Sequence, residues 1–159
     1  MILTKGTIVN TQYHGNLTIE KRLGGGGQGE VFLARDSKND YFVVKWYFKE
    51  QATNAQKKAI SDLISRPLKG KEGERFVWPL DIVTHPSQQD SFGYLMSLID
   101  RSRFAELGDV QSGKMPQPSI STLCKICAQA AQSYRYLHNS GLCYRDISAG
   151  NLMFDPKNG

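Results

Sequence analysis

Three groups of residues in the sequence have the types and spacing needed to handle phosphate groups. The first is the run Gly24-Gly25-Gly26-Gly27-Gln28-Gly29, in which Gly24, Gly26 and Gly29 satisfy the pattern GxGxxG. Glycine suits this task because no Cβ obstructs the approach of a backbone N–H to a phosphate oxygen. Two unrelated kinds of nucleotide site use the pattern, so the residues that follow it decide between them.

The residues after the glycines alternate as in a strand. The segment Glu30-Val31-Phe32-Leu33-Ala34 has no signature of a helix start, whereas a dinucleotide-binding fold opens a helix at its glycines. The sequence therefore favours a glycine-rich turn between two antiparallel strands, an arrangement that folds over the phosphates of a nucleotide. A flexible hairpin loop without a ligand is the alternative interpretation.

The second group centres on Lys45, sixteen positions after Gly29 in the apolar segment Phe42-Val43-Val44-Lys45. Strand alternation places Lys45 on the same face as Val43, so an ammonium group and a small apolar surface face the same way. An ATP pocket needs that combination, and a lysine in so apolar a strand would otherwise be costly to bury. A lysine that points into water is the alternative.

The third group is the segment Tyr144-Arg145-Asp146-Ile147-Ser148-Ala149-Gly150-Asn151. Asp146 precedes Asn151 by five positions, a spacing that can place a carboxylate near a substrate hydroxyl and an amide oxygen on a metal ion. The segment follows the glycines and Lys45 along the chain. The combination of the three groups is more specific than any one of them.

The strands and helices that position these groups follow from the periodicity of apolar residues. Alternation predicts five strands, at 17–23, 30–35, 41–48, 76–83 and 92–99. A change to the helical period predicts a helix over 54–64, with Pro67 as a stop. After an irregular stretch over 100–118, Ser119 is expected to cap a long helix that ends at Gly141.

Length, composition and charge limit the class of protein. The 159 residues suit one domain or a piece of a larger one, and no stretch approaches the roughly 20 apolar residues of a membrane-spanning helix. No secretory signal is evident, so we expect a cytoplasmic protein without a membrane partner. The net charge of +5 is spread along the chain, and its densest basic stretches lack interleaved aromatics, which argues against nucleic acid.

The three cysteines predict reduced thiols rather than a disulfide framework. Cys124 and Cys127 form a CxxC, but this motif lies inside the predicted long helix and has no second pair to complete a zinc site. We therefore expect their side chains to serve structural packing.

From about Leu17 onward the chain resembles a eukaryotic-like serine/threonine protein kinase, because the glycine pattern, Lys45 and an RDxxxxN segment occur in the required order. The resemblance implies an α+β, protein-kinase-like fold. It implies a five-stranded antiparallel N-lobe sheet with one helix over residues 1–99, and the first helical part of the C-lobe over residues 100–159. It also implies ATP-dependent phosphoryl transfer to a protein substrate, with ATP and Mg²⁺ as cofactors.

The resemblance further implies roles for individual residues. The backbone implied to cover the phosphates belongs to Gly24, Gly26 and Gly29. The side chains implied to contact adenine are Leu23, Val31, Val43 and Met153. Met96 would be the gatekeeper residue behind the adenine. The hinge, which would offer backbone hydrogen bonds, would consist of Ser97, Leu98 and Ile99. Lys45 would hold the α- and β-phosphates, Asp146 would orient or deprotonate the acceptor hydroxyl, and Asn151 would help to hold magnesium.

The sequence departs from the kinase pattern at several positions. The helix over 54–64 has a single acid, Asp62, where kinases place a glutamate that pairs with the lysine. Tyr144 stands where histidine is usual. Gly159 comes eight residues after Asn151, before the expected DFG aspartate, so we expect a fragment or truncated product with little or no transferase activity by itself.

Two alternatives stay open. The first is a pseudokinase or scaffold module that binds nucleotide without transferring phosphate, which the missing helix glutamate favours. The second is a small-molecule kinase of related fold. Arg145 argues against the second, because an arginine before the catalytic aspartate commonly contacts a phosphorylated activation loop in protein kinases.

Overall fold

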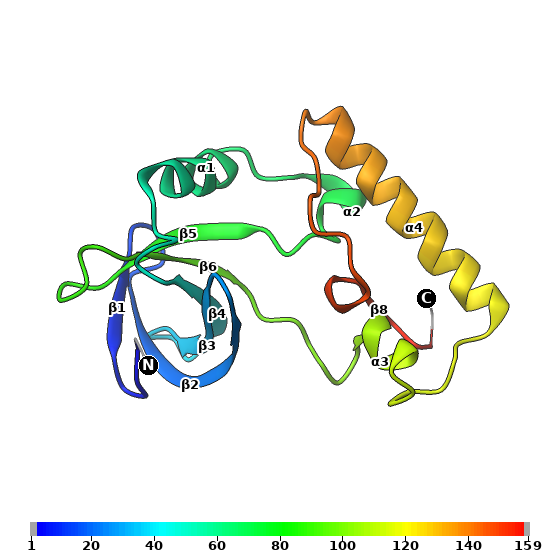
Figure 1. Cartoon of the computed structure of the whole chain (residues 1–159), viewed down its shortest axis with the longest axis horizontal. Helices are drawn as coiled ribbons and strands as arrows, with labels where there is room; N and C mark the ends of the chain where they lie inside the picture. The colour runs from blue at the N-terminus through cyan, green and yellow to red at the C-terminus, as the bar shows by residue number, and fades with distance from the viewer. Residues whose placement is uncertain (1–2, 158–159) are drawn as a thin grey trace. The chain divides into compact units, whose positions relative to one another are not determined.

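The glycine-rich segment joins two strands in the structure, a computed structural model that describes residues 3–157 (Figure 1). Strand β2 (Asn16–Gly26) and strand β3 (Gly29–Arg35) pair antiparallel along their length. A short polar turn leads to β4 (Tyr41–Tyr47), which pairs antiparallel with β3. The glycines therefore connect two strands, as the sequence predicts.

Three further strands complete this sheet. β5 (Pro79–Thr84) and β6 (Gly93–Ser97) form an antiparallel pair, and β6 lies beside β4. β1 (Ile8–Thr11) pairs with both β2 and β5, so the order β1-β2-β3-β4-β6-β5 closes on itself as a barrel. The α+β fold class is confirmed, and β1 is an addition to the five predicted strands.

Two predicted strands are shorter than expected. The strand predicted at 76–83 begins at Pro79, because its pairing with β6 begins there. The strand predicted at 92–99 ends at Ser97. Both predicted strands were too long because they were drawn to the ends of apolar runs. The sequence does not show where hydrogen-bonded pairing with a neighbouring strand stops.

A buried carboxylate fixes the turn between β1 and β2 onto β5. Asp81 is 1% exposed, and it accepts hydrogen bonds from the backbone N–H groups of Gln12 (3.3 Å), Tyr13 (2.6 Å) and His14 (3.1 Å). The Nδ1 atom of His14 also lies 3.1 Å from the same carboxylate. Burial alone would raise the pKa of Asp81, but these hydrogen bonds outweigh it and lower the pKa below its ordinary value.

The barrel encloses one apolar core. Its buried members come from the inward faces of the strands and from the chain before β1, and they are Leu3, Val9, Leu17, Ile19, Phe32, Ala34, Val44, Trp46, Val83 and Leu95. Successive strand residues point to opposite faces, so the residues that alternate with these lie on the outside of the barrel.

Helix α1 (Asn54–Ile64) lies against the outside of the barrel and has the predicted bounds. Thr53 caps it, because its hydroxyl accepts a hydrogen bond from the backbone N–H of Gln56. Ile60 is buried. At the other end, the indole N–H of Trp78 donates to the carbonyl of Leu63 at 3.0 Å, which ties the helix to the chain that enters β5.

The long helix α4 (Ile120–Asn139) begins and ends close to the predicted residues. Ser119 caps its start, accepting a hydrogen bond from the backbone N–H of Thr122 at 3.1 Å. Gly141 has a positive φ of 75° just beyond its end, a conformation that favours glycine. The remaining elements around it are short: α2 (Gly70–Gly73), β7 (Ala105–Glu106), α3 (Leu107–Gln111), the 3₁₀ helix η1 (Ala149–Asn151) and β8 (Met153–Phe154).

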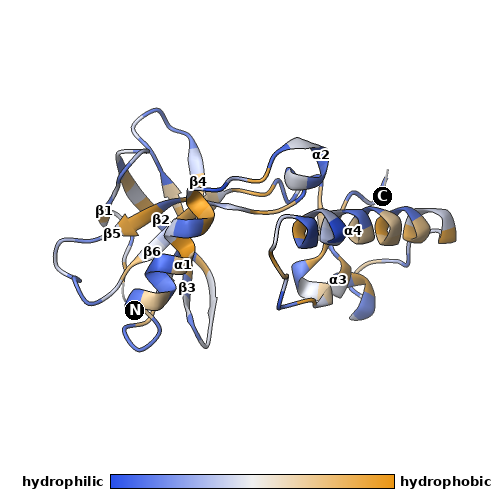
Figure 2. Cartoon of the chain, turned by 90° about the horizontal axis from the view of Figure 1, so that it is seen from above, coloured by the Kyte–Doolittle hydropathy of each residue, from blue (hydrophilic) through white to orange (hydrophobic). Residues whose placement is uncertain are grey.

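The buried side of α4 does not include the two cysteines of the CxxC motif. Its buried residues are Ile126, Ser133 and Leu137, whereas Cys124 and Cys127 are exposed free thiols. Figure 2 shows hydrophilic and hydrophobic residues interleaved along this helix. The prediction that the two cysteines pack structurally is therefore wrong for the described residues.

The described elements divide into two units. The first contains the chain up to Leu68 together with Val77–Leu98, and the second contains Lys69–Phe76 together with the chain from Ile99 onward. The lobe boundaries at 99 and 100 stay a prediction, and the outermost two residues at each end lie outside the described part. Within residues 3–157, none of the helices combines the length and apolar character that crossing a lipid bilayer requires.

Candidate functional site

In the first unit, the strand register gathers several predicted site residues on one outer face of the barrel. Val31 lies directly opposite Lys45 across the β3–β4 pair, and Val43 lies opposite Met96 across the β4–β6 pair. Cross-strand partners share a face, and so do residues two apart in a strand. Val43 is buried to 9% exposure, and the other three are partly exposed. Val31, Val43, Lys45 and Met96 therefore form one continuous surface, apolar except for one cation.

The ammonium group of Lys45 contacts the side chains of Gln28 and Tyr47. Its Nζ atom donates to the Oε1 atom of Gln28, at the tip of the glycine-rich hairpin, at 3.3 Å. It also lies over the ring of Tyr47, 5.5 Å from the ring centre, where the π-face attracts a cation. These contacts connect the hairpin tip to the predicted phosphate-binding lysine.

The glycines of the hairpin differ in what lies beside them. A Cβ added to Gly29 would collide with the backbone carbonyl of Trp46 in β4, so glycine is required there for the strands to approach. A Cβ added to Gly24, Gly26 or Gly27 would meet nothing within 4 Å. The backbone at these three positions therefore has open space beside it, as an incoming phosphate needs.

Helix α1 reaches the same face of the barrel through Tyr47. The amide nitrogen of Gln56 donates to the Tyr47 hydroxyl at 2.9 Å. Burial raises the pKa of Tyr47, and this hydrogen bond opposes the rise. Asp62, the acid of this helix, lies 2.9 Å from Lys58 one turn earlier, and both side chains are exposed. Tyr47 therefore links helix α1 to Lys45, through its hydroxyl on one side and its ring on the other.

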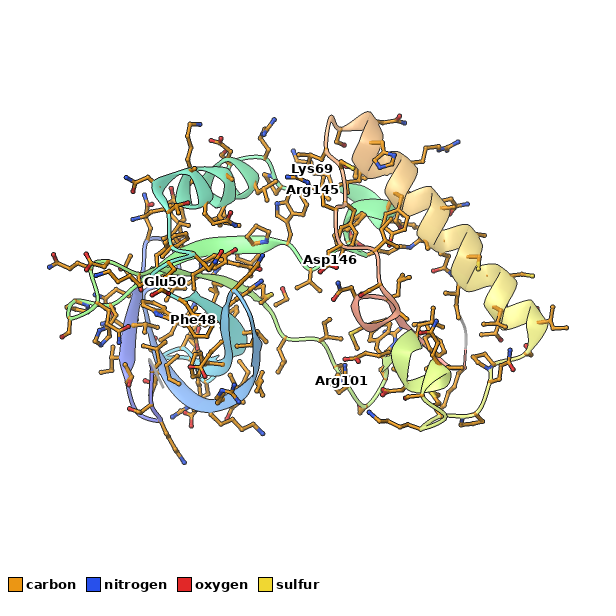
Figure 3. The ribbon with its side chains drawn as sticks, viewed as in Figure 1. Phe48, Glu50, Lys69, Arg101, Arg145 and Asp146 are labelled. Carbon is orange, nitrogen blue, oxygen red and sulfur yellow. The ribbon has the colours of Figure 1, made fainter. Side chains whose placement is uncertain are left out.

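In the second unit, Asp146 and Asn151 belong to one tight loop. The side-chain nitrogen of Asn151 donates to the backbone carbonyl of Asp146 at 3.0 Å. The backbone N–H of Asn151 donates to the carbonyl of Ser148 within the same turn. Arg145 and Asp146 precede this turn on the segment that leaves α4, and both are exposed (Figure 3). Because the amide nitrogen is turned toward the backbone, the Oδ1 atom of Asn151 is the side of the group that can bind a cation.

An aromatic cluster holds the start of this loop. The ring of Tyr144 lies 5.6 Å from that of Tyr134 in α4 and 6.4 Å from that of Phe76. Burial raises the pKa of Tyr144, with smaller contributions from Tyr134 and Asp146. The tyrosine that replaces the usual histidine therefore anchors the loop by packing, two residues before Asp146.

The remaining predicted residues are distributed over both units. Leu23 in β2 and Leu98 beyond β6 are 47% and 45% exposed. Ser97 ends β6, Leu98 is the last residue of the first unit, and Ile99 belongs to the second unit. Met153 lies in β8, with its sulfur 4.0 Å from a guanidinium nitrogen of Arg101. The predicted adenine contacts thus come from both units, and their roles stay predictions.

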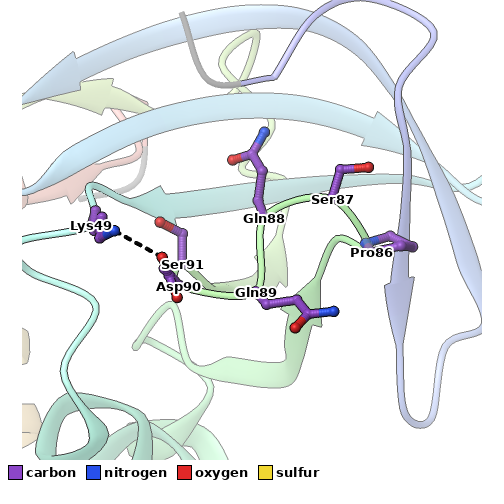
Figure 4. A pocket seen from close by; sticks show the side chains of 7 residues that line it. All are labelled: Lys49, Pro86, Ser87, Gln88, Gln89, Asp90 and Ser91. Atoms are coloured by element: carbon purple, nitrogen blue, oxygen red, sulfur yellow. Dashed lines mark hydrogen bonds and ion pairs between the residues drawn. The ribbon is translucent and has the colours of Figure 1, made fainter.

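A shallow hollow of about 520 Å³ lies elsewhere on the first unit (Figure 4). It is lined by Lys49 and by the loop from Pro86 to Ser91. Lys49 pairs with Asp90 there at 2.8 Å, and both side chains are largely exposed, so water screens the pair. No residue of the predicted site lines this hollow.

Magnesium would depend on few protein ligands. Among the described residues, no group of three or more histidine, cysteine, aspartate or glutamate side chains could hold a metal ion. Mg²⁺ commonly binds through one or two protein oxygens together with substrate phosphates and water. Asn151 fits as one such ligand, with nucleotide phosphates supplying others.

Comparison with known proteins agrees with the fold. A family model described as the protein kinase domain matches residues 17–159, which is most of the chain. The chain therefore belongs to the protein kinase domain family. The glycine hairpin, Lys45 and the Asp146 loop all lie within the matched residues.

Individual relatives are similar over shorter stretches. The serine/threonine-protein kinase csk1 of Schizosaccharomyces pombe is 40% identical over 50 residues, covering 31% of this chain and 16% of that protein. The protein kinase gsk3 of the same yeast is 41% identical over 46 residues, covering 29% of this chain and 12% of that protein. The matched stretch is thus a small fraction of each curated relative.

Solved structures are similar over almost the whole chain. The PknI kinase domain of Mycobacterium tuberculosis has a TM-score of 0.69 at 16% identity, covering 96% of this chain and 58% of that domain. A second solved kinase domain has a TM-score of 0.75 at 16% identity, covering 98% of this chain and 43% of that one. At this identity the likeness establishes the fold, and this chain spans about half the length of those domains.

Two residues beside the predicted site were missed by the sequence analysis. Gln28 lies inside the glycine run, but its contact with Lys45 depends on how the hairpin closes. Tyr47 lies two residues after Lys45, so the same strand alternation that grouped Lys45 with Val43 could have placed it on this face.

Proposed function

We propose that this chain provides the ATP-binding face and the catalytic loop of an ATP-dependent protein kinase of the serine/threonine type. The observation that carries the proposal is the register that sets Lys45 beside Val31 and Val43, on the face next to the open glycines. That face offers an apolar surface for a purine and a cation for its phosphates. A cytoplasmic location is part of the proposal, and free thiols at all three cysteines support it.

Each residue is proposed to act through charge or position. Lys45 neutralises the α- and β-phosphates, and the backbone of Gly24, Gly26 and Gly29 covers them. Asp146 orients or deprotonates the acceptor hydroxyl. Asn151 holds Mg²⁺, which neutralises charge on the transferred phosphoryl group when it is bound. The acceptor is a protein hydroxyl.

Titration of the chain with MgATP tests the binding half of this proposal. Lys45→Met should weaken ATP binding by about tenfold or more, because it removes a charge-assisted contact. Lys38→Met is the matched control, since Lys38 is exposed in the turn at the far end of β3. Equal ATP affinity in the wild type and Lys45→Met would contradict the proposed role of this face.

Transfer of labelled phosphate, measured in a protein that carries this chain, tests the catalytic half. Asp146→Asn should abolish transfer while leaving the affinity for MgATP within about twofold, since the proposed role concerns the acceptor hydroxyl. Asp109→Asn, in α3, is the control. Nucleotide binding without transfer in the wild-type protein would favour the nucleotide-binding scaffold instead.

A further inference from the structure

Gln28 is the one side chain of the glycine-rich tip that reaches the predicted site in the described residues. Its Oε1 atom accepts a hydrogen bond from Lys45 Nζ at 3.3 Å. Its neighbours Gly27 and Gly29 have no side chains, so the carboxamide of Gln28 is the chemical group that this tip presents toward β4.

The backbone holds Gln28 in place for this contact. Its carbonyl accepts a hydrogen bond from the N–H of Phe48, just past the end of β4, at 3.0 Å. Gly26 lies opposite Gly29 at the closure of the hairpin, and Gly29 lies opposite Tyr47. The hairpin tip is therefore attached to β4, the strand that carries Lys45. This attachment restrains the position of the Gln28 side chain relative to Lys45.

An aromatic ring makes a second contact with the ammonium. The ring of Tyr47 lies beneath Lys45, and Gln56 of α1 donates to the hydroxyl of that ring. A lysine ammonium is a point charge on a flexible stem with three rotatable donors, so holding it in one place requires contacts of this kind. The amide oxygen and the ring together restrict where the ammonium group lies.

We propose that Gln28 is a positioning residue that aims the Lys45 ammonium at the phosphates of a bound adenine nucleotide. The proposal rests on the proposed function, because it concerns the same lysine and the same ligand. Gln28 is neutral, so it holds the ammonium without competing strongly for its charge. A carboxylate in the same place would compete, and it would also repel the phosphates.

If Gln28 positions the Lys45 ammonium, it affects only the binding of the phosphate groups and not the binding of the base and ribose. Adenosine has the same base and ribose as ATP but no phosphate, so it does not use Lys45. Gln28 variants should therefore change the binding of ATP and leave the binding of adenosine unchanged. A side chain that merely stabilised the barrel would affect both ligands alike.

The experiment titrates the whole chain with MgATP and, separately, with adenosine, following backbone amide signals by NMR. Gln28→Ala should weaken ATP binding by about three- to tenfold, which matches the net contribution of one ordinary hydrogen bond. Gln28→Glu should weaken it by about tenfold or more, because the carboxylate pairs with Lys45 and repels phosphate. The affinity for adenosine should stay within about twofold in both variants.

Gln89 supplies matched controls, because it is an exposed glutamine of the same unit in the loop between β5 and β6 (Figure 4). Gln89→Ala and Gln89→Glu should bind both ligands as the wild type does. Unchanged ATP affinity in both Gln28 variants, or an equal loss for ATP and adenosine, would overturn the role of Gln28 alone. A wild-type chain that binds no ATP would instead overturn the proposed function, and this inference with it.

Discussion

Gly29 in β3 packs directly against the backbone carbonyl of Trp46 in β4, closer than a residue with a side chain could approach. The contact lies where the glycine-rich hairpin meets the strand that carries Lys45. Gly26, on the other side of the hairpin tip, has open space where a Cβ would be. Two glycines of one motif therefore have different physical reasons to be glycine.

A methyl group at Gly29 should accordingly cost stability. We expect Gly29→Ala to lower the free energy of unfolding by about 2–4 kcal/mol, because the added Cβ forces β3 away from β4. Gly26→Ala is the control and should change it by less than about 1 kcal/mol. Urea unfolding followed by tryptophan fluorescence measures both, and equal stabilities of the two variants would contradict this explanation.

The hydrogen bond between Gln56 and Tyr47 should contribute to the docking of α1 on the barrel. Tyr47→Phe removes the hydroxyl and keeps the ring beneath Lys45, so stability should fall by about 1 kcal/mol while ATP affinity stays within about twofold. Gln56→Ala should have a similar effect. In a double-mutant cycle the two losses should be less than additive; full additivity would show that the two side chains do not interact.

Asp81 should make the first unit sensitive to acid. Its pKa in the folded protein lies below the ordinary value of 3.8, so its contribution to stability is present above that pH and is lost as the pH falls through the lowered pKa. Asp81→Asn should be less stable by about 2–4 kcal/mol at pH 7, and its stability should vary less below pH 4. Asp40→Asn, in the exposed turn before β4, should retain the wild-type acid profile in chemical unfolding measured from pH 7 to pH 2.

The aromatic packing of Tyr144 should determine the stability of the second unit. Tyr144→Ala should destabilise it by about 2–4 kcal/mol, because the rings of Tyr134 and Phe76 lose their shared neighbour. Tyr144→Phe keeps the ring and should cost less than about 1 kcal/mol. Hydrogen exchange of backbone amides over residues 69–76 reports the effect, and equal protection in both variants would mean that the ring is not the anchor.

Local patterns were sufficient to predict the parts of the fold that depend on neighbouring residues. The bounds of α1 follow from a change of period within eleven residues, and the start of α4 follows from the serine cap at Ser119. Alternation also placed Lys45 and Val43 on one strand face. Each of these signals is contained in a short window of sequence.

Other features depend on pairings that are distant along the chain. β1 is four residues long with only two aliphatic side chains, and its partners in β5 are more than 70 residues away. The buried side of α4 depends on what packs against it, so exposed Cys124 and Cys127 could not be separated from Ile126 by period alone. The contact from Gln28 to Lys45 requires the closed hairpin register. These features become visible only once the strands are paired.

The closure of the barrel by β1 has a consequence for how the first unit meets other chains. A sheet that ends in an unpaired strand offers a row of free N–H and C=O groups, onto which another extended chain can add. In the described ring β1-β2-β3-β4-β6-β5, each strand has a neighbour on both sides. Over the length at which β1 pairs with β5, recruitment of a peptide by strand addition, and aggregation by the same route, would first require these two strands to separate.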